Sequence, residues 1–186
     1  MTYLILRIMF FPIFRIFLKK IQGIKNIPNK RPFIVIANHE SRWDHILVLL
    51  PILKKLNKKV HFIAVPTWWY VHEKIYRQWA GAIPLFNPKQ AYKEAKELIE
   101  AGEIVAIFPE GRFERKKRRE NPKTGAIRLA LETNTPILPM GLRFSYKPFS
   151  STTNVGKLIY LSKNKNIKKQ TLDLIKHVYK LKNELS

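Results

Sequence analysis

Short apolar runs alternate with longer amphipathic segments along most of this chain, and this alternation restricts the fold to a narrow class. The apolar runs are rich in β-branched residues, which is typical of buried strands. The expected strands are Phe33–Ala37, Val60–Val65, Ala82–Phe86, Ile104–Phe108, Ile137–Leu142 and Val155–Leu161. Strands separated by helices favour a parallel arrangement. The 186 residues therefore predict a single α/β domain with a largely parallel mixed sheet flanked by helices.

The segments between these runs have the periodicity of helices. The helix after Asn87 has the clearest boundaries, because Asn87 can cap its N-terminus, Pro88 suits its first position and Gly102 can end it. Its expected apolar face consists of Ala91, Tyr92, Ala95, Leu98 and Ile99. The other expected helices are Trp43–Leu53, which Pro51 should shorten, Trp68–Trp79, Thr124–Thr133 and Lys169–Glu184.

The first apolar stretch, Tyr3–Leu18, differs from the later runs because cations and Pro12 interrupt it. It is shorter than the about 20 apolar residues that a membrane-spanning helix needs. One side of its helical wheel would carry Arg7, Arg15, Lys19 and Gln22. We therefore expect residues 1–27 to form an amphipathic, membrane-associating helix and a connection, and residues 28–186 to form the main domain. A signal peptide and a helix buried against the domain are the alternatives.

The net charge is the most unusual property of the composition. Lys and Arg number 35 and Asp and Glu number 13, which gives a formal charge of +22. Such a charge attracts polyanions, whether nucleic acid, anionic lipid or an acidic partner protein. The chain has no cysteine, which excludes disulfides, a thiolate nucleophile and a Cys-ligated metal centre.

Functional residues of open α/β sheets gather where the strands end. After the first expected strand, His39 is followed five residues later by Asp44, at the start of a helix. If the chain turns there, the Asp44 carboxylate can bind one imidazole nitrogen, fix the tautomer and leave the other nitrogen as a base. The alternatives are local capping by Asp44 or coincidence. A metal site that also uses His45 lacks a clear third ligand, so we expect no metal.

A second polar segment follows the fourth expected strand. Gly111 permits close approach of a ligand to the backbone, and the planar guanidinium of Arg112 suits a phosphate or carboxylate. An unbroken run of cations, residues 115–119, comes next. That run is also compatible with a solvated loop, a nuclear-localisation signal or a nucleic-acid patch.

Taken together, these two segments resemble the glycerolphosphate acyltransferase family, and most of all its lysophosphatidate acyltransferase branch. The resemblance rests on the HX4D motif, Asn38-His39-x4-Asp44, after one strand and on Phe108-Pro109-Glu110-Gly111-Arg112 after a later one. It covers residues 30–145. Other segments similar to the family, in the same order, are Gly81–Leu85, Lys123–Ala130 and Thr135–Gly141.

The resemblance implies a peripheral membrane acyltransferase of phospholipid biosynthesis, at the cytoplasmic face of the cell membrane. His39 would be the general base and Asp44 its orienting partner, while Glu110, Gly111 and Arg112 would bind the acceptor. The enzyme would need no cofactor, with acyl-CoA or acyl carrier protein as co-substrate and lysophosphatidate as acceptor. No protein nucleophile is expected, and the chain has no Gly-x-Ser-x-Gly segment.

Two departures from the family pattern concern recognition of the acceptor. Asn87 stands where the family usually has an arginine, and Arg112 follows Gly111 directly where many members have a residue between them. Other candidates for phosphate or membrane contacts are Arg77, Lys89, Arg115, Lys116 and Lys123. The alternatives are therefore a different lysophospholipid or lipid alcohol as acceptor, a membrane-surface protein without catalysis, and a basic nucleic-acid-binding module. Because the resemblance rests on the HX4D motif of an enzyme family, we expect no nucleic-acid partner.

Overall fold

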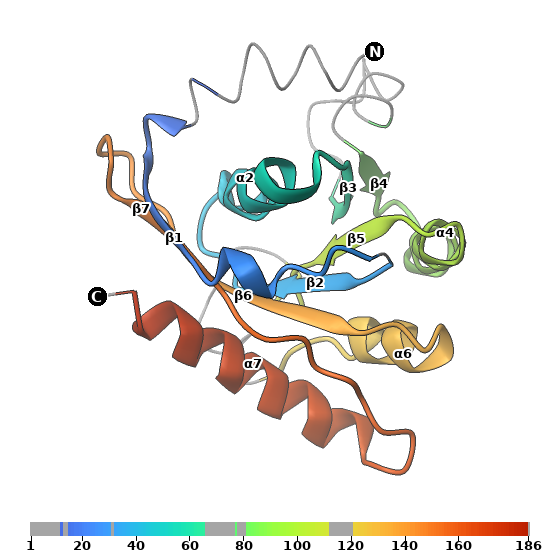
Figure 1. Ribbon diagram of the computed structural model, residues 1–186. Coiled ribbons are helices and arrows are strands. Elements are labelled where there is room, and N and C mark those ends of the chain that lie inside the picture. The colour runs from blue at the N-terminus through green and yellow to red at the C-terminus, as the bar shows by residue number, and fades with distance from the viewer. Residues whose placement is uncertain are drawn as a thin grey trace.

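The computed structural model describes residues 12, 15–30, 32–65, 77, 81–111 and 121–185. Within them, a seven-stranded sheet has the order β1-β7-β6-β2-β5-β3-β4 (Figure 1). The elements are β1 (Leu18–Gln22), η1 (Ile24–Asn26), β2 (Ile34–Ala37), α2 (Asp44–Leu56), β3 (Val60–Ala64), β4 (Ala82–Pro84), α4 (Pro88–Glu100), β5 (Ile104–Ile107), α6 (Gly125–Glu132), β6 (Ile137–Arg143), β7 (Ser151–Val155) and α7 (Ile167–Asn183). The strands from β6 to β4 run parallel, and β7 pairs antiparallel with β6. The predicted α/β domain with a largely parallel mixed sheet is confirmed.

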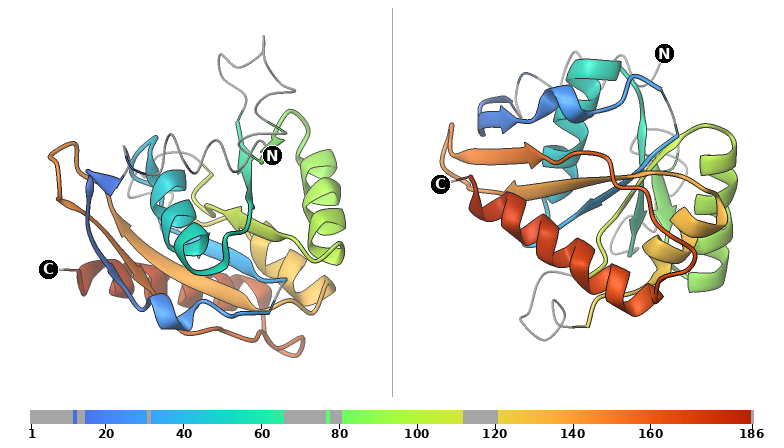
Figure 2. Two further views of the ribbon diagram at one scale, coloured as in Figure 1. Left: turned by 45° about the horizontal axis from the view of Figure 1, so that its top comes forward. Right: turned by 60° about the horizontal axis from the view of Figure 1, so that its bottom comes forward.

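Helices cover both faces of the sheet, and each face has its own apolar cluster. Val35 and Ala37 of β2 pack with α2, whereas Ile34 and Ile36 belong to the cluster that α4, α6 and α7 cover. Figures 1 and 2 show α2 on one side of the sheet and α6 with α7 on the other. Successive side chains of a strand point to opposite faces, so a strand covered on both sides must be apolar throughout. This is why the central strands were recognisable as continuous apolar runs.

Helix α2 continues beyond Pro51 to Leu56, so the prediction that Pro51 shortens it is wrong. Proline has no N–H and cannot bind the carbonyl four residues earlier, which here belongs to Leu47. That carbonyl instead accepts a hydrogen bond of 3.1 Å from the Thr153 hydroxyl of β7. Tertiary structure therefore satisfies the group that the proline leaves unpaired, and the helix is not broken.

Helix α4 matches its predicted boundaries. The Asn87 side chain accepts a hydrogen bond of 2.9 Å from the Lys89 backbone N–H, and Pro88 opens the helix. Gly102 has φ of 81°, a left-handed conformation that suits glycine just after a helix.

Strands β1 and β7 differ from the sequence-based expectation. Lys19 and Gln22, placed on a helix by their periodicity, lie in β1, which pairs in parallel with β7. The last strand is Ser151–Val155 instead of Val155–Leu161, and Ile159 forms only an isolated bridge to Ile137. Strand β7 is polar in sequence yet fully buried, and the side chains of Thr153 and Asn154 find partners there. Asn154, for example, donates to the Leu181 carbonyl at 3.0 Å.

Two predicted helices lie outside the described residues. These are Trp68–Trp79, apart from Arg77, and the N-terminal amphipathic helix, apart from Pro12 and residues 15–18. In the part of the chain that the structure describes, no helix combines the length and apolar character needed to cross a bilayer.

Candidate active site

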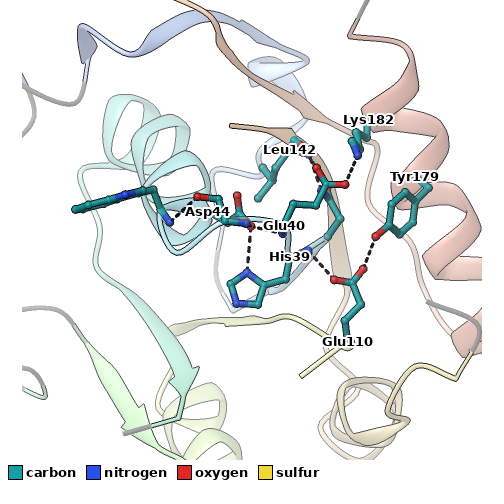
Figure 3. A network of polar contacts seen from close by, with 10 residues as sticks. His39, Glu40, Asp44, Glu110, Leu142, Tyr179 and Lys182 are labelled. Atoms are coloured by element: carbon teal, nitrogen blue, oxygen red, sulfur yellow. Dashed lines mark hydrogen bonds and ion pairs between the residues drawn. The ribbon is translucent and has the colours of Figure 1, made fainter. Parts of the chain in front are cut away.

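The two segments singled out in the sequence meet at one edge of the sheet. His39 follows β2 and Glu110 follows β5, and β2 and β5 are parallel neighbours whose registered pairs include Ile36 and Ile107. The carboxyl ends of parallel strands lie at the same edge, which brings these two loops together. Figure 3 shows both residues in one network of polar contacts.

His39 and Asp44 form a hydrogen-bonded pair. His39 Nδ1 lies 3.0 Å from Asp44 Oδ2, and the side chains of His39 and Asp44 are 19% and 1% exposed. An Nδ1–H that donates to the carboxylate leaves Nε2 as the nitrogen able to accept a proton. The spacing of five residues works because the chain turns between β2 and the first residue of α2, which is Asp44 itself.

The same carboxylate oxygen shapes the loop that carries His39. Asp44 Oδ2 also accepts hydrogen bonds from the backbone N–H groups of Glu40, at 2.6 Å, and Ser41, at 2.7 Å. Hydrogen bonds to a charged acceptor are stronger than neutral ones, about 1.5–3 kcal/mol each. Asp44 therefore fixes the backbone of the loop and the orientation of the imidazole together.

The imidazole lies against an aromatic side chain from the neighbouring strand end. The rings of His39 and Phe108 are stacked, with centroids 4.4 Å apart and an angle of 19° between their planes. Phe62 continues this arrangement, with its ring centroid 6.4 Å from that of Phe108. The ring of His39 is thus held by a hydrogen bond at one nitrogen and by an apolar surface along its face.

Glu110 is a buried carboxylate that supports the His39 loop. It is 4% exposed. Its Oε2 accepts a hydrogen bond of 2.7 Å from the His39 backbone N–H, and its Oε1 accepts one of 2.8 Å from the Tyr179 hydroxyl. Burial raises the pKa of Glu110, while the hydrogen bonds from Tyr179 and His39 act in the opposite direction. Both oxygens have protein donors, so direct binding of the acceptor by Glu110 stays a prediction.

Asn38 connects the His39 loop to β6. Its side-chain amide donates to the Leu142 carbonyl at 2.9 Å, and its carbonyl accepts from the Leu142 N–H at 2.7 Å. Asn38 is fully buried, so this pair of bonds satisfies polar groups that would otherwise be costly. Asn38 therefore ties the start of the His39 loop to β6.

Lys123 is the cation that the described structure brings to the Glu110 loop. Its backbone N–H donates to the Pro109 carbonyl at 2.9 Å. Gly111 has φ of 74°, and a Cβ built there would lie 3.1 Å from Lys123 Cε. A larger residue at position 111 would therefore be strained and would crowd Lys123.

Two of the other predicted contact residues, Arg77 and Lys89, lie away from His39. Arg77 pairs with Glu94 of α4 at 2.7 Å. Lys89 is exposed at the start of α4, after β4, and β5 and β3 separate β4 from β2 in the sheet. Arg112, Arg115 and Lys116 lie outside the described residues.

Helix α7 supplies site residues that sequence reasoning missed. Tyr179 binds Glu110, and Lys182 forms an ion pair with Glu40 (Figure 3). The available signal was weak: a tyrosine on the apolar face of an amphipathic helix and one lysine among many. No group of three or more His, Asp or Glu side chains suited to a metal ion occurs among the residues that are described.

Comparison with known proteins supports the resemblance inferred from the motifs. A family model described as Acyltransferase matches residues 19–143. A chloroplastic 1-acyl-sn-glycerol-3-phosphate acyltransferase, BAT2, of Brassica napus is 29% identical over 129 residues, covering 66% of this chain and 36% of that protein. The 1-acyl-sn-glycerol-3-phosphate acyltransferase of Pseudomonas aeruginosa is 26% identical over 128 residues, covering 65% of this chain and 48% of that protein.

A solved structure has the same fold. The crystal structure of the 1-acyl-sn-glycerophosphate acyltransferase PlsC from Thermotoga maritima superposes with a TM-score of 0.66 at 22% identity, covering 90% of this chain and 73% of that one. The matched regions span only 36% and 48% of the two curated relatives described above. The family match spans more than half of this chain and contains the His39–Asp44 pair and Glu110, and the chain therefore belongs to the acyltransferase family.

Proposed function

We propose that this protein transfers a fatty acyl group from an acyl thioester to the free hydroxyl of lysophosphatidate, which gives phosphatidate. The observation that carries the proposal is the 3.0 Å contact between His39 Nδ1 and Asp44 Oδ2, at the strand edge where the Glu110 loop also lies. The family match and the names of the relatives support acyl transfer to a lysophospholipid.

In this reaction the acceptor hydroxyl attacks the thioester carbonyl directly. Nε2 of His39 takes the hydroxyl proton as the new carbon–oxygen bond forms, and Asp44 stabilises the resulting imidazolium. The tetrahedral intermediate then collapses, the carbon–sulfur bond breaks, and the departing thiolate takes the proton back from Nε2. No covalent acyl-enzyme is required, which is consistent with a chain that contains no cysteine.

The direct test is a transfer assay that crosses donors with acceptors. Acyl-CoA and acyl carrier protein serve as donors, and lysophosphatidate, lysophosphatidylcholine and monoacylglycerol as acceptors, all in anionic vesicles. We expect phosphatidate from lysophosphatidate with at least one donor. The charge of +22 favours an acidic carrier protein by electrostatic steering. Absence of product from every pair would contradict the proposed function.

We propose that Arg112 and Lys123 bind the phosphate of the acceptor. Replacing Lys123 with glutamine should raise KM for lysophosphatidate about five- to tenfold, because one ionic contact to the phosphate is lost. KM for monoacylglycerol, which has no phosphate, should change less than about twofold. Lys168→Gln is the matched control, since Lys168 is an exposed residue in the first turn of α7, at the other end of that helix from Tyr179 and Lys182. Equal losses with both acceptors would show that Lys123 does not recognise phosphate.

A second acceptor class is favoured by one observation. Asn87 caps helix α4 through its side-chain oxygen, where the family pattern leads us to expect a phosphate-binding arginine. A different lysophospholipid or a lipid alcohol is therefore the alternative substrate. The same crossed assay decides between them, because faster transfer to an acceptor without a phosphomonoester would favour the alternative.

Both substrates carry fatty chains, so we propose that the enzyme works at an anionic membrane surface, on the cytoplasmic face. Each Lys or Arg near such a surface contributes about 1 kcal/mol of attraction. A variant lacking residues 1–11 should float with anionic vesicles at a reduced fraction while retaining β1, which begins at Leu18. Vesicles of neutral lipid are the control. Unchanged flotation would show that these residues do not mediate membrane binding.

A further inference from the structure

Helix α7 reaches the candidate active site through two side chains that lie on the same side of the helix. Tyr179 and Lys182 are three residues apart, a spacing that places side chains next to one another on a helix. Figure 3 shows both directed from α7 towards the His39 loop. We propose that Tyr179 and Lys182 are positioning residues that hold His39 in its catalytic orientation, an inference that rests on the proposed acyl transfer.

Tyr179 acts on the backbone of His39 through Glu110, and Lys182 contacts the next residue, Glu40. The Tyr179 hydroxyl donates to Glu110, whose other oxygen accepts from the His39 backbone N–H at 2.7 Å. Lys182 binds the carboxylate of Glu40, the residue after His39. Asp44 accepts from the next two N–H groups, those of Glu40 and Ser41. Three successive N–H groups of the loop are thus bound by two buried carboxylates, one of which α7 holds.

The placement of α7 depends on close packing against β6 and β7. A Cβ built at Gly141 would lie 2.2 Å from the Lys182 backbone nitrogen, so only glycine allows α7 to approach β6 at this point. Asn154 of β7 donates to the Leu181 carbonyl at 3.0 Å. These contacts fix the register in which Tyr179 and Lys182 face the loop. Residues 167–183 lie beyond the matched family region, 19–143, so that match does not assign this role.

If the inference is right, the charge state of Glu110 gives kcat a distinctive pH dependence. Among the described residues, the groups facing Glu110 are Tyr179 from α7 and His39 and Glu40 from the loop, with Lys182 paired to Glu40. Burial raises the pKa of Glu110, and the hydrogen bond from Tyr179 lowers it. Removing the Tyr179 hydroxyl should therefore raise this pKa further. A larger fraction of Glu110 is then protonated at acidic pH. The acidic limb of the pH profile of kcat, where kcat falls as the pH is lowered, should therefore move upward in pH.

The kinetic experiment compares Tyr179→Phe and Lys182→Gln with the controls Tyr160→Phe and Lys180→Gln. Tyr160 is 75% exposed and Lys180 is an exposed residue of the same helix. We expect kcat to fall about tenfold in Tyr179→Phe and Lys182→Gln, with KM for both substrates within about twofold of the wild type. Lys182→Arg should restore most of the loss, because it retains the ion pair. The acidic limb should move upward in pH in Tyr179→Phe and stay in place in Tyr160→Phe.

Two kinetic results would overturn the inference. If the acidic limb is unchanged and kcat falls no more than in the controls, Tyr179 and Lys182 do not position His39. The same conclusion follows if KM alone changes, because a misplaced base should act on kcat.

Amide hydrogen exchange tests the inference without using activity. In Tyr179→Phe, the His39 amide should exchange about tenfold faster than in the wild type, because its acceptor is held less firmly. Amides of α4, such as that of Ala95, should not change. Unchanged exchange at His39 overturns the inference at any level of activity. If the wild type transfers no acyl group, the proposed function fails, whereas faster exchange would still support the contact from α7 to the loop.

Discussion

Replacing His39 with alanine should lower kcat for acyl transfer by about 10³-fold, because the acceptor hydroxyl loses the group that takes its proton. The fold should persist, since the His39 side chain is 19% exposed and the loop is held through backbone N–H groups that alanine retains. Binding to anionic vesicles should persist as well, because the imidazole is not part of the proposed membrane contact. Steady-state kinetics with lysophosphatidate, together with circular dichroism and vesicle flotation, measure these three properties.

His61→Gln is the control for the His39 variant. His61 lies in β3, and burial lowers its pKa, as does the nearby charge of Lys59. Its replacement should leave kcat within about twofold of the wild type. If His39→Ala retains more than about a tenth of the wild-type kcat, His39 is not the general base.

Replacing Asp44 with asparagine should lower kcat by a similar factor, about 10³-fold or more. All three donors, His39 Nδ1–H and two backbone N–H groups, reach the single oxygen Oδ2, and asparagine offers an oxygen without the negative charge that strengthens these bonds and stabilises the imidazolium. If its NH₂ group donates to Nδ1, the proton moves to Nε2 and the base is lost. Stability should fall by about 1–3 kcal/mol, because N–H groups lose a charged acceptor. Kinetics and thermal unfolding measure the two effects.

The control for the Asp44 variant is Asp173→Asn, which changes an exposed carboxylate on α7. It should alter neither kcat nor the free energy of unfolding by much, since exposed charges contribute little. A change of less than about fivefold in kcat for Asp44→Asn would contradict the orienting role of Asp44.

The central sheet was predictable because each strand carries its own evidence. Strands β2, β5 and β6 are covered on both faces, so their sequences are apolar throughout and stand out between helical segments. Helix α4 was equally clear, because Asn87 and Gly102 mark its ends through local contacts. These signals depend on residues near one another in the chain.

Strand β7 and the full length of α2 were not predictable, because their determinants are distant in sequence. Strand β7 buries Thr153 and Asn154, whose polar side chains resemble those of a loop until their partners are known. One of those partners is the Leu47 carbonyl, left without a helical donor by Pro51. The same hydrogen bond therefore accounts for an unrecognised strand and for a helix predicted to be too short.

The candidate site also contains contacts that could be predicted from the sequence and contacts that could not. The His39–Asp44 pair could be predicted because five residues separate its members and a single turn brings them together. Proximity to Glu110 followed from strand ends that share one edge of the sheet. The contacts of Tyr179 and Lys182 could not be predicted, because they depend on how α7 packs at Gly141 and Asn154. For Lys182 and Glu40 the separation in sequence is 142 residues.

The most direct test of the central claim is the tautomer of His39, measured by NMR spectroscopy of nitrogen-labelled protein above the pH at which the ring is protonated. The hydrogen bond to Asp44 predicts that Nδ1 carries the proton and that Nε2 has the chemical shift of an unprotonated ring nitrogen. Asp44→Asn should lower the fraction of rings in this form, because an uncharged amide oxygen binds Nδ1–H less strongly than a carboxylate does. A wild-type protein with the proton on Nε2 would contradict the account, because the nitrogen that should take the acceptor's proton would already hold one.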